Sequence, residues 1–156
     1  MENDAFSSYN KEGMFEGATS FNQTLNDWDT SNVTNMSSMF SGATSFNQPL
    51  DKWDTTNVTN MSGMFERATS FNQPLNDWDT SNVRDIEHMF SKAIKFNQSL
   101  DNWNISSIPN VGCIKDIFLD SGLEEDNYCK LFKGKSKEIS TKYKSILGVS
   151  SYYKCN

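Results

Sequence analysis

The chain has 156 residues and a formal net charge of −6, with 36% hydrophobic and 13% aromatic residues. Residues 1–122 carry 7 basic and 16 acidic side chains, whereas residues 123–156 carry 7 lysines and 4 acidic side chains. The acidic body lacks the lysine and arginine rows that track a phosphate backbone, so no nucleic-acid partner is expected. No apolar run approaches the ~18 residues that span a bilayer, so no membrane insertion is expected either.

Residues 1–13 form the second half of a degenerate repeat. Ser8 and Lys11 stand where the next repeat has Val33 and Met36, so the apolar columns are vacant at this end. Terminal units of repeat arrays are atypical because they have a neighbour on one side only. We therefore expect a degenerate N-terminal unit, followed by the regular array at residues 14–116.

The stretch SFNQPLDKWDTTNVTNMSGMF, residues 45–65, recurs before and after itself in a constant register, so that Phe21, Phe46, Phe71 and Phe96 stand at equal intervals. A period of this size is typical of a solenoid, in which each unit buries its apolar face against its neighbours. The predicted core is the set of large apolar side chains that recur in register: Phe46, Leu50, Trp53, Val58, Met61, Met64, Phe65 and Trp78.

Each unit divides into three parts. FNQPL is predicted to be extended, since Pro49 and Pro74 prevent helix continuation. WDTTNVTNM begins with a turn in which Asp54 accepts a backbone bond, and a short strand follows at residues 58–61. Met64 to Ala68 is predicted to be a single helical turn. The alternative is a helix-dominated coil, which the Asn, Thr, Ser and Pro content disfavours.

After Trp103 the pattern loosens. Ile117-Phe118 falls three residues late for the Met-Phe pair, which indicates an insertion around Pro109–Lys115. Ser121 to Glu124 has the pattern of a capping box, and a helix is predicted from Glu124 to Lys133. A second, lysine-rich helix is predicted from Ser136 to Leu147. Residues 117–156 are therefore interpreted as a helical C-terminal cap over the last repeat.

Cys113, Cys129 and Cys155 all lie outside the regular repeats. An odd count without a CxxC pair fits neither a disulfide framework nor a zinc site, although one disulfide between two of them stays open. Residues 1–15 lack the apolar core of a signal peptide. Neither the cysteine pattern nor residues 1–15 therefore decide the cellular compartment.

The repeat WDTSNVTNMSSMFSGATSFNQPL resembles a family of unknown function first described in mycoplasma proteins and also found in bacterial surface lipoproteins and giant-virus proteins. SGLEEDNYCKLF and ILGVSSYYKC resemble the terminal cap of that family. VTNMSSMFSGATSF is in addition similar to BspA-like leucine-rich repeats. This similarity implies a right-handed, leucine-rich-repeat-like solenoid with a short strand and a helical turn in each 25-residue coil. The family implies surface display or host interaction, so a cell-surface, secreted or virus-associated location is expected.

The sequence offers little for catalysis. His88 is the only histidine, and no Ser-His-Asp or Cys-His set can be assembled around it. No enzyme and no cofactor are therefore expected.

Asp29, Asp54 and Asp79 form one column, and we interpret them as turn-forming residues. The alternative is a calcium site between coils, for which these three are weak candidates. The Asn columns, which include Asn47 and Asn72, are predicted to form internal amide ladders, with carbohydrate binding as the alternative.

The positions at which the repeats disagree are the best candidates for recognition. In a rigid register, side chains that are free to vary are expected to point outward. The candidate interaction surface consists of these varying positions: Ser37, Ser38, Ser62, Gly63, Glu66, Arg67, Glu87, His88 and Lys92. The predicted function is a non-enzymatic scaffold for protein–protein interaction or surface recognition, with a carbohydrate- or calcium-dependent adhesion module as the alternative. The protein partner is unidentified. The chain is expected to be a monomer, or a weak dimer through an N-terminal edge that Phe6 and Tyr9 shield only weakly.

Overall fold

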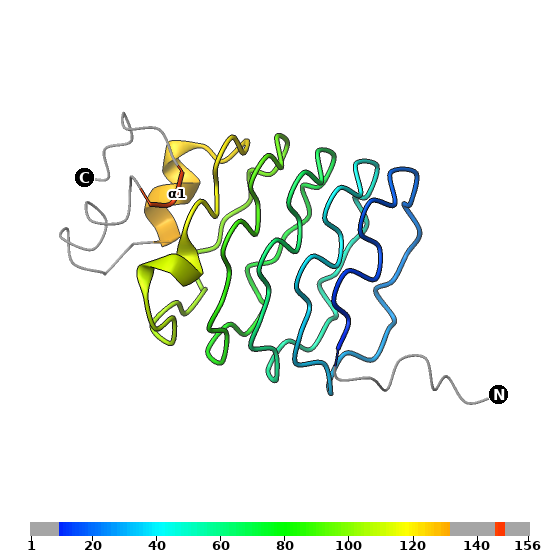
Figure 1. The fold of residues 1–156 in the computed structure, drawn as a ribbon, viewed down its shortest axis with the longest axis horizontal. Coiled ribbons are helices and arrows are strands. Elements are labelled where there is room, and N and C mark those ends of the chain that lie inside the picture. Colours follow the sequence, from blue (N-terminus) through cyan, green and yellow to red (C-terminus); the bar gives the residue numbers. More distant parts are fainter. Residues whose placement is uncertain (1–9, 132–145, 149–156) are drawn as a thin grey trace.

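The computed structural model describes residues 10–131 and 146–148, and shows the sequence repeats as coils lying side by side along the long axis (Figure 1). A short 3-10 helix, η2 (Val111–Ile114), follows the fourth full repeat, and one α-helix, α1 (Glu125–Leu131), lies at the C-terminal end of the stack. Most of each coil consists of turns and irregular backbone.

The prediction of a leucine-rich-repeat-like solenoid, with a strand and a helical turn in each coil, is wrong. The described residues contain no strand and no sheet. Neighbouring coils share only isolated parallel bridges that join Asn10 to Asn35, Asn35 to Asn60, and Asn60 to Asp85. The predicted strand over residues 58–61 therefore contracts to the single bridge residue Asn60.

The backbone N–H groups of residues 61–68 explain why neither a strand nor a helix forms. Every second N–H donates to a carbonyl of the next coil at 2.8 to 2.9 Å, from Met61, Gly63, Phe65 and Arg67. The intervening N–H groups of Met64, Glu66 and Ala68 donate to the carbonyl three residues earlier in their own coil. The backbone groups are thus paired without a continuous ladder or an α-helical register.

The predicted helical turn at Met64 to Ala68 is likewise replaced by consecutive β-turns. Gly63 and Arg67 have φ angles of 61° and 56°, in the left-handed region. An α-helix needs an unbroken run of right-handed φ angles. Left-handed residues four positions apart therefore exclude it.

The core is a set of parallel aromatic columns. The Phe40 and Phe65 rings stack with centroids 5.5 Å apart, and the Trp53 and Trp78 rings with centroids 6.3 Å apart. All eight residues of the predicted core are buried. The Trp53 indole Nε1–H donates to the Leu25 carbonyl at 2.9 Å, so this buried polar group is satisfied from the preceding coil.

The predicted insertion is visible as a shift in the register between coils. The Met61 N–H donates to the Asp85 carbonyl, whereas the Ile86 N–H, one repeat later, donates to Cys113 instead of Asn110, where the unbroken period would place the acceptor. The extra residues are taken up by η2, after which the Phe118 ring stacks on Phe90 with centroids 5.9 Å apart. The Ile117-Phe118 pair thus continues the Met-Phe column.

The C-terminal end of the stack is covered by α1 and by residues 146–148. Helix α1 lies within the range predicted from Glu124 to Lys133, but the capping box at Ser121 does not form. The N–H of Glu124 donates instead to Asn97 Oδ1 at 3.0 Å. Phe118 N–H donates to the Leu147 carbonyl at 2.9 Å, and Leu147 is fully buried.

Several expectations fall outside the described residues: the cover by Phe6 and Tyr9, the helix from Ser136 through residue 145, and Cys155. Residues 146–148 form a turn. Cys113 carries a free thiol, and Cys129 is disulfide-bonded.

Candidate interaction surface

One edge of the molecule is built from five equivalent turn segments: residues 12–17, 37–42, 62–67, 87–92 and 115–120. We call this edge the turn edge. Each segment has a left-handed residue at its second position and another at its sixth. The second positions form the first column, which is Gly13, Ser38, Gly63, His88 and Asp116. The sixth positions form the second column, which is Gly17, Gly42, Arg67, Lys92 and Asp120.

The left-handed backbone explains why glycine recurs at these positions. Glycine has no Cβ and adopts a positive φ readily, whereas other L-residues pay about 1–2 kcal/mol there. Even so, Arg67, His88 and Lys92 keep side chains at φ angles of 56°, 56° and 59°. The third and fourth coils thus carry basic side chains at positions where the backbone itself favours glycine.

The structure divides the sequence-predicted surface residues into two groups. Ser37 is 6% exposed and Gly63 is buried, so variation at these positions does not mean that they point outward. The side chain of Arg67 is 62% exposed, and its ion pair with Glu66 is long, at 3.6 Å. His88 lies 3.6 Å from Glu87, with side chains 38% and 40% exposed. Ser38, Ser62 and Lys92 are also at least partly exposed.

The fourth coil carries two exposed residues that lie outside the predicted interaction surface, Ile94 and Lys95. Ile94 is 59% exposed, more than any other large apolar residue in the described part of the chain. The earlier coils have Thr-Ser at these two positions. The signal was therefore present in the sequence as the change from SGATSF at residues 41–46 to SKAIKF at residues 91–96.

The Asp column is used to form turns. Asp29 Oδ1 accepts from both the backbone N–H and the hydroxyl of Ser31, at 3.0 and 2.6 Å. Asp54 makes the same pair of bonds with Thr56, and Asp79 accepts the Ser81 N–H. The Ser31 hydroxyl, followed by the Ser31 N–H, lowers the pKa of Asp29. Within the described part of the chain, no group of three or more metal-binding side chains lies close enough to hold a metal ion.

The Asn columns form a ladder along the stack. Asn47, Asn72 and Asn97 each donate their N–H to the side-chain oxygen of the Asn one coil earlier, at 2.9 Å every time. Gln73 and Gln98 reinforce the ladder through their amide nitrogens. Asn127 of α1 makes equivalent bonds to the Asn97 carbonyl and side chain, at 3.0 and 2.9 Å. The ladder therefore satisfies the backbone and anchors the cap.

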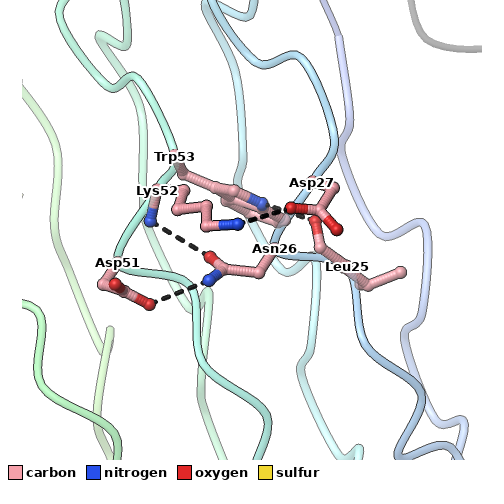
Figure 2. A network of polar contacts seen from close by, with 6 residues as sticks. All are labelled: Leu25, Asn26, Asp27, Asp51, Lys52 and Trp53. Atoms are coloured by element: carbon pink, nitrogen blue, oxygen red, sulfur yellow. Dashed lines mark hydrogen bonds and ion pairs between the residues drawn. The ribbon is translucent and has the colours of Figure 1, made fainter.

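A separate exposed network joins the first and second coils near the Trp column (Figure 2). Asn26 bridges the two coils by donating to Asp51 and accepting from the Lys52 N–H, at 2.9 and 3.0 Å. Lys52 Nζ forms an ion pair with Asp27 at 2.7 Å, with both side chains largely in solvent. These groups contact one another, and their exposure limits what the ion pair adds to stability.

The profile of one protein family matches residues 9–122, which is most of the chain; its description is "Mycoplasma protein of unknown function, DUF285". The chain belongs to the DUF285 family. This confirms the resemblance that the repeat motif carries. No curated protein and no solved structure matches the chain. Among the described residues of this DUF285 protein, no helix is both long enough and apolar enough to cross a bilayer.

Proposed function

We propose that this DUF285 protein is a non-enzymatic binding module that recognises a protein partner along its turn edge. The observation that carries the proposal is the presence of the basic residues Arg67, His88 and Lys92 at left-handed positions where the first two coils have glycine or serine. Non-glycine residues in such conformations raise the energy of the folded state and recur at functional sites. Their side chains are exposed or half-exposed, so core packing gives no reason to retain them.

The surroundings of His88 support a non-enzymatic role. Its Nε2 lies 3.6 Å from Glu87, on a turn that is open to solvent. Catalytic histidines act within hydrogen-bond reach of a nucleophile and in partial isolation from water. A carboxylate neighbour on an exposed turn supplies neither condition.

We further propose that the module is displayed at a cell or virus surface and acts as a monomer. The proposal of surface display follows from the resemblance to surface lipoproteins and viral repeat proteins. The monomer follows from the cover that α1 and Leu147 give to the C-terminal coil, which removes one of the two ends available for stacking.

The test compares three forms of the intact chain for retention of proteins from an extract of the source organism's natural host. The turn-edge variant carries Arg67→Gly, His88→Gly and Lys92→Gly, which remove side chains while keeping a backbone conformation that glycine adopts easily. The control carries Asp27→Asn and Asp77→Asn, at two exposed positions outside the turn edge. We expect a partner that binds the wild type and the control but is lost from the turn-edge variant.

Equal retention by all three forms would contradict a recognition role for the turn edge. A glycan array, read with and without a chelator, tests the adhesion alternative. Glycan binding that the chelator abolishes would replace the protein-binding proposal with a calcium-dependent one.

A further inference from the structure

The fourth coil departs from the repeat at three of four consecutive positions, and every departure is exposed. Lys92 replaces the Gly of the first two coils, and Ile94 and Lys95 replace the Thr-Ser of the first three. Arg67 stands one coil earlier in the column of Lys92, and its N–H donates to the Ser91 carbonyl at 2.8 Å. We call these four residues the basic-apolar patch: Arg67, Lys92, Ile94 and Lys95.

These departures weaken the local structure. In the preceding coils, the hydroxyls of Thr44 and Thr69 donate to the carbonyl of the Thr one coil earlier, at 3.2 and 3.3 Å. Ile94 has no hydroxyl, so the column loses this bond at the fourth coil. Lys92 adopts a φ of 59° in place of a glycine. The patch therefore has Lys92 and Ile94 where glycine and threonine would suit the backbone better.

The next coil passes close to Ile94 without covering its side chain. A Cβ at Gly122 would collide with the Ile94 carbonyl oxygen, so glycine permits this close backbone approach. Ile94 remains 59% exposed and is close in sequence to Lys92 and Lys95. Within the described residues, neither the Lys92 nor the Lys95 ammonium group is in an ion pair.

We propose that the basic-apolar patch binds an acidic peptide segment of the partner, with an apolar side chain against Ile94 and flanking carboxylates on Arg67, Lys92 and Lys95. This inference rests on the proposed function and names the chemistry of its partner. An apolar contact ringed by charge pairs is the usual composition of an interface centre and its rim. Three cations on a body of net negative charge suit a few carboxylates better than an extended polyanion.

The test is an NMR titration of the full chain with a pentapeptide that has a central leucine between two aspartates on each side. We expect amide shifts confined to residues 67 and 92–95, and binding that weakens as salt is added. A peptide with asparagine in place of each aspartate should bind at least tenfold more weakly. A peptide with alanine in place of leucine should also lose affinity.

Two variants make the assignment specific. Lys92→Gly, Ile94→Thr and Lys95→Ser together restore the sequence of the second coil, and should abolish the shifts while raising the melting temperature. The reciprocal change of Gly17→Arg, Gly42→Lys, Thr44→Ile and Ser45→Lys copies the four patch residues onto the first and second coils and should create a second peptide site there.

Peptide shifts that persist in the restored variant, or that appear equally with the asparagine peptide, would overturn the proposal. Phosphatidylserine vesicles and single-stranded poly(U) RNA serve as competing anions, and tighter binding of either would also overturn it. If the peptide fails to bind but a host protein is still lost from the turn-edge glycine variant, the acidic-peptide inference fails alone. If that variant also retains every host protein, the proposed function fails as well.

Discussion

The second and fourth coils share one backbone path and differ in what they present at the turn edge. Residues 42 and 92 both have left-handed φ angles, of 70° and 59°, and the rings of Phe40 and Phe90 lie in the same buried column. At these equivalent positions the second coil has glycine and the fourth has lysine. The interior of a coil is thus held constant while its edge changes, and the predictions below test that division.

The largest effect is expected in the interior. Trp53→Ala should lower the free energy of unfolding by about 3–5 kcal/mol, because it empties a packed column and leaves the Leu25 carbonyl without its indole donor. Trp28→Ala is the matched control, since this indole in the first coil is only partly buried and should cost less. Denaturant titration measures both. Equal losses would show that burial between two coils does not determine the stability of the column.

The Asn ladder comes next. Asn72→Ala should cost about 1–2 kcal/mol in denaturant titration, because it leaves the Asn97 N–H and the Gln98 amide without their 2.9 Å acceptor. Gln23→Ala, at an exposed ladder position in the first coil, should change stability by less than about 0.5 kcal/mol. An Asn72 variant as stable as the wild type would mean that solvent replaces the ladder.

The smallest effect belongs to the exposed Asp column. Bonds from the Ser81 N–H and hydroxyl lower the pKa of Asp79 from its ordinary 3.8. A carboxyl with a lowered pKa stabilises the fold above its ordinary pKa, and this contribution disappears as the pH falls through the lowered value. The melting temperature should therefore fall slightly below about pH 4, and by less in Asp79→Asn.

Millimolar calcium should leave the melting temperature at neutral pH nearly unchanged, because the Asp carboxylates already accept bonds within their own turns. A rise of several degrees that Asp54→Asn abolishes would instead assign the column to a cation.

The sequence predicts those features of the structure that follow from the repeat period, and it does not predict the others. The burial of Phe46, Trp53 and Met61 follows from the period, because identical residues in register must stack. The local backbone does not follow from it. Between residues 61 and 68, the backbone N–H groups donate alternately to the next coil and to their own coil, and this alternation depends on left-handed turns. In the sequence, only glycines indicate such turns. Arg67 stands at a left-handed position without being glycine, so the sequence gives no sign of the turn there.

Other features could not be predicted because they lie outside the period or contradict an assumption about it. Asn127 continues the Asn-Gln ladder from within α1, where no repeat register identifies it. Variation between repeats does not by itself indicate exposure, because Ser37 varies and is buried. Ile94 and Lys95 could have been found by asking which changes make a residue more apolar or more charged than its equivalents.

The most direct test of the account is the thermal stability of the double variant Arg67→Gly and Lys92→Gly, measured beside the wild type by calorimetry. If these side chains are retained for recognition, glycine at the two left-handed positions should lower the free energy of the folded state. This gain should exceed the stabilisation of the unfolded chain by the added conformational entropy of glycine. The double variant should then be more stable by about 1 kcal/mol and melt several degrees higher. A lower melting temperature would show that Arg67 and Lys92 serve the fold, and would contradict the assignment of the turn edge to binding.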